Sequence, residues 1–274
     1  MTQMNDQNPL VLSVTSGKGG VGKTNLSVNL AYTLQRKGKR VLLMDADLGL
    51  ANVDILLGLA PEYNIFHLVY DEKKLEEVLV RTSYGFTILP AASGVPEMLK
   101  LSTGQKLELI ESLETLGQET DILIVDTGAG IGDNVIYFNL AVQERILVLT
   151  PEPTSLTDAY ATVKVLHNQH GVHRFRVIVN MATDPKQAKQ TFQRLTAACD
   201  KFLDGVSLDL IGSLPHDPKV RQAITTQVPF CHAFPSSTPA MAVNKIAENI
   251  LSWPKTAKTD GNIKFFWKRL LFNT

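Results

Sequence analysis

The chain has 274 residues, a length that suits one large α/β domain able to bury its own hydrophobic core. Its 27 basic and 27 acidic residues cancel, so the net charge does not favour a protein that binds nucleic acid directly. The sparse cysteines, the polar first eight residues and the absence of any apolar run near the roughly 18 residues of a membrane span together predict a cytoplasmic protein.

Apolar runs that suit buried strands recur along the chain, and helical patterns lie between most of them. The expected strands are 10–15, 41–44, 86–89, 122–125, 146–149, 176–179 and 208–211, and the expected helices include 23–37, 105–116, 157–167 and 185–202. Alternating strands and helices predict an α/β fold with a doubly wound, mostly parallel sheet flanked by helices. Ligands of such sheets bind at the carboxyl ends of the strands.

The order of these segments also predicts how the chain is divided. We expect a polar N-terminal extension at 1–9, the α/β domain at 10–253, a linker at 254–261 and a C-terminal amphipathic helix at 262–274. Residues 254–274 contain five basic side chains and one aspartate, a local charge of +4, so the rest of the chain carries about −4.

The first predicted strand and helix are joined by a glycine-rich phosphate-binding loop. It fits the pattern G-x-x-x-x-G-K-[ST], and its residues are Gly17, Lys18, Gly19, Gly20, Val21, Gly22, Lys23 and Thr24. Glycines at this density let backbone N–H groups surround a phosphate chain, and the N-terminus of the following helix favours the same anion. We expect Lys23 to contact the β- and γ-phosphates, Thr24 to bind Mg²⁺, and Asn25 to lie at the nucleotide. The loop therefore predicts a nucleotide-binding protein.

Lys18 is a second lysine inside the loop, which an ordinary phosphate loop does not need. It is either a solvated surface lysine or a cation that meets a nucleotide held by a partner subunit. Its context resembles the deviant Walker A motif, K-G-G-x-x-G-K-T, of the ParA/MinD family of dimerising ATPases. The resemblance implies that Lys18 contacts ATP across a homodimer interface and takes part in catalysis there.

Carboxylates follow two of the predicted strands, beside the phosphate loop: Asp45 and Asp47 after one, Asp126 after the other. Mg²⁺ at a nucleotide needs few protein ligands besides phosphates and water, so one hydroxyl and one or two carboxylates suffice. Asp126 resembles the Walker B aspartate, which acts on Mg²⁺, and Asp47 resembles the switch I aspartate that orients the attacking water. For Asp45 two interpretations remain open: a Mg²⁺ carboxylate, or a side chain that caps a helix or holds a turn after the strand.

The strand end at 179–183 bears on the identity of the base. GTPases of related architecture carry N-K-x-D at such a place, but this chain has Thr183 at the position of the guanine-reading aspartate. Asn180 resembles the adenine-contacting asparagine of MinD-like proteins. Pro215 and Asp217 belong to a loop that we expect to close over the base. The sequence therefore predicts ATP rather than GTP as the nucleotide.

Glu152 and Asp158 follow another strand end. In the ParA/MinD family this segment lies at the dimer face, so the resemblance implies that both residues lie at the interface and that Asp158 can pair with Lys18. Ser155-x-x-Asp158 is also a capping-box-like start of a helix, which would explain those two residues without any partner. The sequence leaves both interpretations open.

The end of the chain, 263–272, forms an amphipathic pattern on a helical wheel. Basic residues lie on one side, and the apolar face consists of Ile263, Phe266, Trp267, Leu270 and Leu271. A short basic helix with aromatic anchors suits an anionic membrane surface, and two such helices on a dimer bind far more strongly than one. The alternative is a helix docked on its own domain or in a partner's groove.

Segments along most of the chain, 45–54, 90–94, 152–160, 234–237 and 265–271, together resemble the FlhG/FleN flagellar number regulators, which are MinD-like ATPases. The resemblance implies slow ATP hydrolysis that resets an ATP-dependent dimer, located at the inner membrane or cell pole when ATP is bound. It also implies partners besides a second copy: the σ54-dependent flagellar activator FleQ, whose ATPase activity such proteins antagonise, and the flagellar GTPase FlhF.

The N-terminus departs from this pattern. Many FlhG proteins begin with a D-Q-A-x-x-L-R segment that stimulates FlhF, whereas this chain has Asp6-Gln7-Asn8-Pro9-Leu10, with a proline and no arginine. We therefore expect control of the transcription activator to be the main task rather than stimulation of FlhF. The alternative function is a MinD- or ParA-like ATPase that positions division machinery or DNA.

Overall fold

One central sheet organises the part of the chain that the computed structural model describes, residues 9–47, 52–65, 67–70, 73–90, 102–254 and 263–272. Its eight strands lie in the order β3-β4-β2-β5-β1-β6-β7-β8. Neighbouring strands are parallel except β3 and β4, which pair antiparallel at one edge. The strands are β1 (Leu10–Ser16), β2 (Val41–Ala46), β3 (Val80–Arg81), β4 (Thr87–Pro90), β5 (Ile122–Ala129), β6 (Glu144–Leu149), β7 (Arg174–Ala182) and β8 (Ser207–Pro215).

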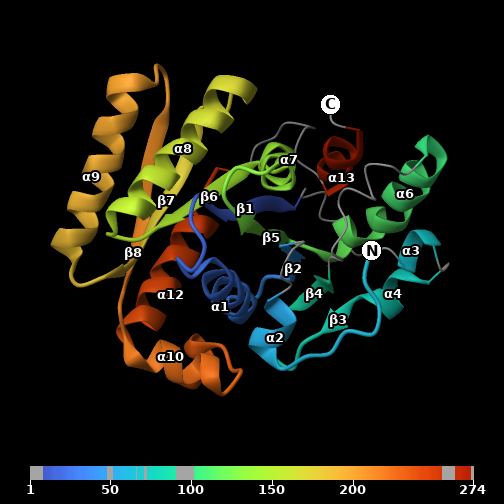
Figure 1. Ribbon diagram of the computed structural model, residues 1–274. Helices are drawn as coiled ribbons and strands as arrows, with labels where there is room; N and C mark the ends of the chain where they lie inside the picture. The colour runs from blue at the N-terminus through green and yellow to red at the C-terminus, as the bar shows by residue number, and fades with distance from the viewer. Residues whose placement is uncertain are drawn as a thin grey trace.

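Helices connect these strands and cover both faces of the sheet (Figure 1). The described helices are α1 (Lys23–Arg36), α2 (Val53–Leu57), α3 (His67–Tyr70), α4 (Leu75–Val78), α6 (Thr103–Glu119), α7 (Asp133–Ala141), α8 (Pro153–His170), α9 (Pro185–Phe202), α10 (Pro218–Thr225), α11 (Phe230–Ala233), α12 (Thr238–Leu251) and α13 (Ile263–Phe272).

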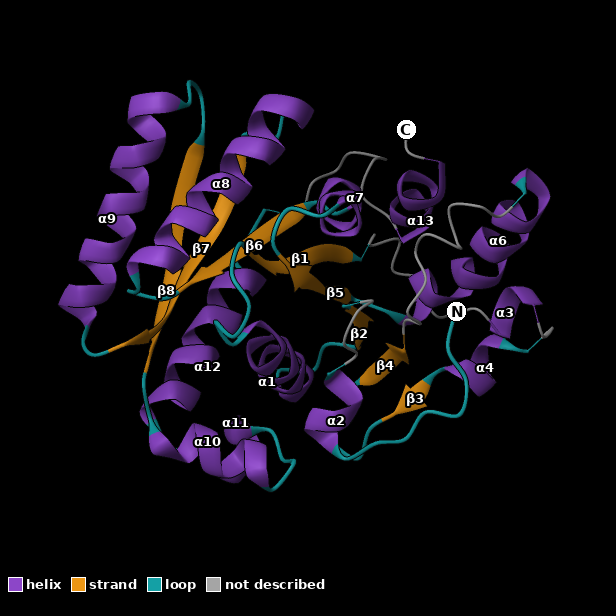
Figure 2. Cartoon of the chain, in the orientation of Figure 1, coloured by secondary structure: helices purple, strands orange, loops and turns teal. Residues whose placement is uncertain are grey.

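Helices form a layer on each face of the sheet (Figure 2), and the hydrophobic core lies between these layers and the strands. On one face, α1, α2, α11 and α12 pack against the strands. On the other face, α6, α7 and α13 cover β2 and β5, while α8 and α9 cover β6 and β7. Every residue of β2 is buried, as expected for a parallel strand with helices on both sides. The predicted fold, a doubly wound and mostly parallel sheet flanked by helices, is confirmed.

The C-terminal helix α13 packs against the domain, between α6 and α7 (Figure 1). Phe266, Trp267, Leu270 and Leu271 are each at most 2% exposed. They belong to the face that the sequence predicts to lie on a membrane, so in this structure protein covers that face. A groove of apolar side chains removes the face from water as lipid would, which is why the wheel pattern cannot distinguish the two. The alternative left open by the sequence, a helix docked on its own domain, is the arrangement observed.

Some expectations fall on segments outside the described residues. These are residues 1–8 of the polar extension, the 48–51 and 91–94 parts of two family-like segments, residues 255–261 of the linker, and residues 262, 273 and 274 of the C-terminal helix. Among the helices that the structure does describe, none is both long enough and apolar enough to cross a membrane.

Candidate functional site

The phosphate-binding loop lies where the sequence predicts it, between the carboxyl end of β1 and the first turn of α1. Gly22 precedes α1 with a φ of 91°, in the left-handed region that favours glycine. A Cβ atom at Gly22 would also collide with the side-chain amide of Asn180 in β7. At the start of the loop, a Cβ atom at Gly17 would overlap the backbone carbonyl of Asp158 in α8. β7 and α8 therefore both close on the loop, and they can do so only against glycine.

Lys23 is buried at the N-terminus of α1, with 8% of its surface exposed. Burial lowers the pKa of its ammonium group, and the attraction of Asp126 and Asp47 opposes that shift. The lysine therefore faces two carboxylates inside the site, at a helix N-terminus where a phosphate group is favoured.

Asp126 is fully buried on β5, beside the phosphate loop. Its Oδ1 accepts a hydrogen bond from the Ser27 hydroxyl at 2.8 Å, while its Oδ2 has no partner among the described residues. Burial raises its pKa to about 7, and the hydroxyls of Thr24 and Ser27 act in the opposite direction. An unpartnered carboxylate oxygen in the interior is costly, and Mg²⁺ prefers oxygen ligands of this kind. Thr24 and Asp126 thus fit a Mg²⁺ ion, which they would hold at the phosphates.

Asp45 is also buried, but its oxygens are engaged by the backbone. Oδ2 accepts the N–H groups of Asn52 and Val53 at 3.0 and 3.1 Å, and Oδ1 accepts the N–H of Asp47 at 3.1 Å. Burial raises the pKa of Asp45 to about 6, against the effect of these three bonds. The structure therefore shows the second of the two roles left open by the sequence: Asp45 holds the turn after β2 and the start of α2.

Asp47 directly follows β2, close to the carboxyl end of β5. A Cβ atom at Gly128 would lie 3.4 Å from Asp47 Oδ1, so the glycine leaves room for the carboxylate. The two carboxylates after β2 therefore differ in role. Asp45 is committed to the backbone, whereas the side chain of Asp47 accepts no such bond among the described residues and is available to orient a water molecule.

A cavity of about 160 Å³ opens beside the phosphate loop. Asn180, Pro215 and Asp217, all predicted to contact the base, line it together with Gly22 and Asn25. Asn180 Nδ2 donates to the Val21 carbonyl of the loop at 2.7 Å, which fixes the end of β7 against the phosphate site. Asp217 has a second role, because its carboxylate accepts the Lys219 N–H and caps α10.

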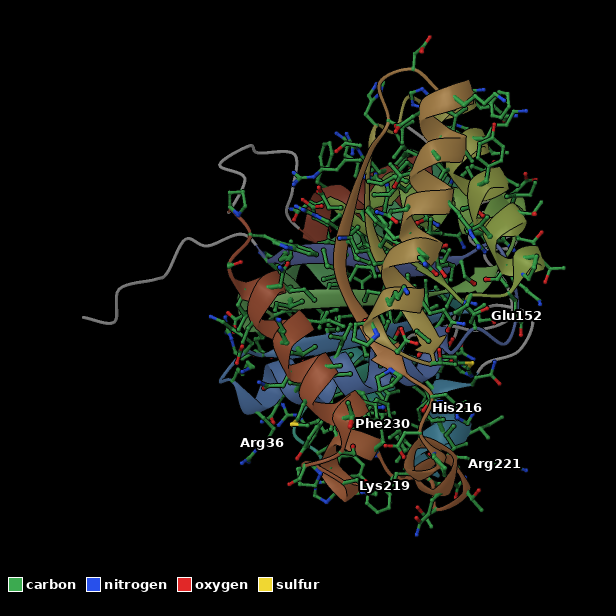
Figure 3. The ribbon with its side chains drawn as sticks, turned by 90° about the vertical axis from the view of Figure 1, so that its left-hand side faces the viewer. Arg36, Glu152, His216, Lys219, Arg221 and Phe230 are labelled. Atoms are coloured by element: carbon green, nitrogen blue, oxygen red, sulfur yellow. The ribbon has the colours of Figure 1, made fainter. Side chains whose placement is uncertain are left out.

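The remaining wall of the cavity was not expected from the sequence. Val220, Arg221 and Ile224 of α10 and Phe230 of α11 line it. Figure 3 shows His216, Arg221 and Phe230 gathered at the same end of the molecule. No local motif marks these residues, because they follow the last strand and reach the loop only through the fold. The apolar side chains of Val220, Ile224 and Phe230, together with the Asn180 amide, suit a flat heterocyclic base.

Lys18 stands at the mouth of the loop and is held by its own chain. Its ammonium group forms an ion pair with Glu152 and donates a hydrogen bond to the Thr154 hydroxyl at 2.8 Å. The side chains of Lys18 and Glu152 are 35% and 62% exposed, so water screens the pair. The predicted partner Asp158 is not among the groups that bind Lys18 in the described residues. It contributes its backbone to the packing of α8 on the loop instead.

The capping-box interpretation of the same segment is wrong. α8 begins at Pro153 with Glu152 as the preceding residue, so Ser155 already lies inside the helix. The Ser155 hydroxyl accepts the backbone N–H of Thr150 at 3.0 Å and ties the helix to the end of β6. Proline in the first turn starts this helix because its missing N–H has no intrahelical partner there.

Comparison with known proteins identifies the family. The profile of the ParA family, described as NUBPL iron-transfer P-loop NTPase, matches residues 8–251. The chain belongs to the ParA family of P-loop NTPases. It is 46% identical over 272 residues to the antiactivator FleN of Pseudomonas aeruginosa, covering 99% of this chain and 97% of that protein. It is 32% identical over 270 residues to the flagellum site-determining protein YlxH of Helicobacter pylori, covering 97% and 91%.

A solved structure supports the same assignment. The septum site-determining protein MinD of Pyrococcus horikoshii, complexed with Mg-ADP, matches with a TM-score of 0.70 and 28% identity over 89% of this chain and 96% of that chain. The predicted family, FlhG/FleN-like proteins within the MinD/ParA ATPases, is confirmed. This ParA-family protein is a P-loop ATPase, and its relatives include an antiactivator and a flagellum site-determining protein.

Proposed function

We propose that this protein is an ATP-dependent dimerising switch that restrains flagellar gene expression by antagonising a σ54-dependent flagellar activator. The observation that carries the proposal is the position of Lys18. It lies at the exposed mouth of the phosphate loop, and it is held by Glu152, just before α8, and by Thr154 in the first turn of that helix. An exposed ion pair contributes only about 0–1 kcal/mol, so Lys18 can exchange Glu152 for a more highly charged anion.

In the proposal, that anion is the phosphate chain of ATP bound to a second copy of the protein. In a two-fold symmetric dimer both subunits use the same surface, so the exchange occurs twice, once for each Lys18. The dimer then forms only when both subunits hold ATP. The similarity to the antiactivator FleN supports an output in transcription control.

Hydrolysis resets the switch by removing the γ-phosphate. Asp47 orients the attacking water, and Lys23 stabilises charge on the phosphates. Mg²⁺ held by Thr24 and Asp126 would supply further neutralisation of that charge. The cavity next to Asn180 supports ATP as the nucleotide, because its wall carries the asparagine amide expected for adenine and Thr183 follows in place of a guanine-reading aspartate.

Membrane attachment forms a second output in the proposal, and it requires α13 to leave its site. The buried side chains of α13 cannot meet lipid while they lie between α6 and α7. Two released helices on one dimer bind a bilayer more strongly than one, so dimerisation favours attachment. The expected position is therefore the cytoplasm without ATP and the inner membrane or cell pole with it.

The partners follow the same logic. We propose the activator FleQ as the main partner of the ATP-bound dimer and the GTPase FlhF as a further one. The similarity to an antiactivator supports the first. For FlhF, Asp6, Gln7 and Asn8 of the departing N-terminal pattern lie outside the described residues, whereas Pro9 is described and Leu10 begins β1.

Sedimentation velocity tests the central step. Non-hydrolysable ATP with Mg²⁺ should convert the protein from monomer to dimer at micromolar concentration, and Lys18→Ala should prevent the conversion. Lys189→Ala is the matched control, because Lys189 is an exposed lysine of α9 away from the loop. A wild-type protein that stays monomeric refutes the proposal.

A pulldown tests the output. The Asp47→Ala variant, which should bind ATP and hydrolyse it poorly, is used as bait in polar-flagellated cells. Recovery of the flagellar activator supports the proposal. Recovery of division or chromosome-partition proteins supports the MinD- or ParA-like alternative and contradicts it.

A further inference from the structure

Gln227 ends helix α10 in a backbone conformation that side chains rarely adopt. Its φ is 55°, and its N–H donates to the Ile224 carbonyl at 3.1 Å. The next N–H, of Val228, donates to the Ala223 carbonyl at 3.0 Å. This pair of bonds is a Schellman motif, in which the position of Gln227 is usually glycine. A glutamine at such a position is strained, and the surrounding structure must compensate for it.

The compensating contact is with the short helix α2. Gln227 Nε2 donates a hydrogen bond to the Ile55 carbonyl at 2.7 Å. Gly58, which ends α2 with a φ of 64°, leaves room for the amide: a Cβ atom there would lie 2.9 Å from Gln227 Oε1. The side chain of Gln227 therefore joins the C-terminal ends of two helices that are far apart in the sequence.

α2 is held at its other end by Asp45. The same carboxylate accepts the N–H groups of Asn52 and Val53 with one oxygen and that of Asp47 with the other. α2 is thus fixed at its N-terminal end to a group that also positions Asp47, the residue assigned to the attacking water. A shift of α2 acts on the Asp47 backbone through a shared hydrogen-bond acceptor.

α10, the helix that Gln227 ends, forms a wall of the cavity beside the phosphate loop through Val220 and Ile224. We propose that Gln227 is a positioning residue that couples occupation of this cavity to the placement of Asp47, acting through α2. Gln227 does not line the cavity, so it does not recognise the nucleotide itself. The inference rests on the proposed binding of the adenine base in this cavity.

Hydrogen exchange on the full chain with Mg·ADP tests the coupling without requiring a dimer. In the wild type, ADP should slow exchange in both α10 and α2. Gln227→Gly suits the left-handed backbone and removes the amide. In this variant ADP should still protect α10, but its protection of α2 should be about two- to tenfold weaker than in the wild type, the equilibrium effect of one hydrogen bond. Its kcat for ATP should fall by a similar factor with KM unchanged.

Gln222→Ala is the matched control, since Gln222 is an exposed glutamine of the same helix that does not line the cavity. It should behave as the wild type in both measurements. Equal protection of α2 in the wild type and Gln227→Gly overturns the inference. The inference is also overturned if ADP protects α10 but not α2 in the wild type, a result that still supports the proposed base site. If ADP protects the phosphate loop and neither helix, the base site itself is wrong and the coupling with it.

Discussion

Replacing Trp267 by alanine should release α13 from the domain. The indole is fully buried, with 0% exposed, and packs edge to face on Phe266 with ring centroids 4.9 Å apart. Truncating a buried aromatic side chain to alanine costs about 3–5 kcal/mol. The indole Nε1 has no hydrogen-bond partner among the described residues. Removing this unsatisfied buried donor stabilises docking by about 1–3 kcal/mol and offsets part of that cost. The net loss is about 2 kcal/mol, or roughly thirtyfold in the docking equilibrium.

Hydrogen exchange of the α13 amides in the nucleotide-free protein measures this equilibrium. Trp267→Ala should speed exchange in α13 by about thirtyfold and leave β1 and β5 unchanged, because only the local opening is affected. Trp267→Phe keeps an aromatic ring and removes the unpartnered N–H, so it should exchange no faster than the wild type. Lys268→Ala, on the exposed side of the same helix, is the control for the substitution itself.

Two results would refute this reasoning. If α13 in Trp267→Ala exchanges at the wild-type rate, the indole does not hold the helix in place. If α13 exchanges faster in Trp267→Phe than in the wild type, the unpartnered N–H is not a net cost and the lost ring volume decides docking.

Three further substitutions probe the nucleotide site. Gly22→Ala should lower the free energy of unfolding by about 1–2 kcal/mol and abolish nucleotide binding, because Gly22 has a positive φ and lies against Asn180. Gly104 has open space around it, so the control Gly104→Ala should have neither effect in urea unfolding and calorimetry. Asp47→Asn should reduce kcat for ATP by about tenfold or more with ATP affinity retained, and an unchanged kcat would exclude Asp47 from water positioning. Asn180→Ala should weaken ATP binding about two- to tenfold through the lost bond to the loop, and equal affinity in calorimetry would contradict that role.

Elements with strong local patterns are predicted well from the sequence. The helix expected at 185–202 has the same bounds in α9, because a proline starts it and an apolar stripe runs its full length. The strands expected at 176–179 and 208–211 extend further at both ends in β7 and β8, because pairing between neighbours continues into polar residues. β3 is missed, since two residues at a sheet edge carry no periodic pattern.

The candidate site divides in the same way. Asn180 and Pro215 are found at the cavity as expected, because parallel strands bring their carboxyl ends to one edge of the sheet. Ile224 and Phe230 are not found from the sequence, since they come from helices that no motif links to the phosphate loop. Gln227 looks like any polar surface residue until its φ and its bond to Ile55 are known.

The sequence by itself determined the phosphate loop, the α/β fold and the family, because each depends on spacing within continuous segments or on order along the chain. Only the tertiary structure decided which groups those segments meet. It engaged Asp45 with the backbone and left one oxygen of Asp126 without a partner in the described part of the chain. It also gave Lys18 the partner Glu152 rather than Asp158 and covered the apolar face of α13 with protein. These outcomes depend on contacts between residues far apart in the chain, and local patterns carry no record of them.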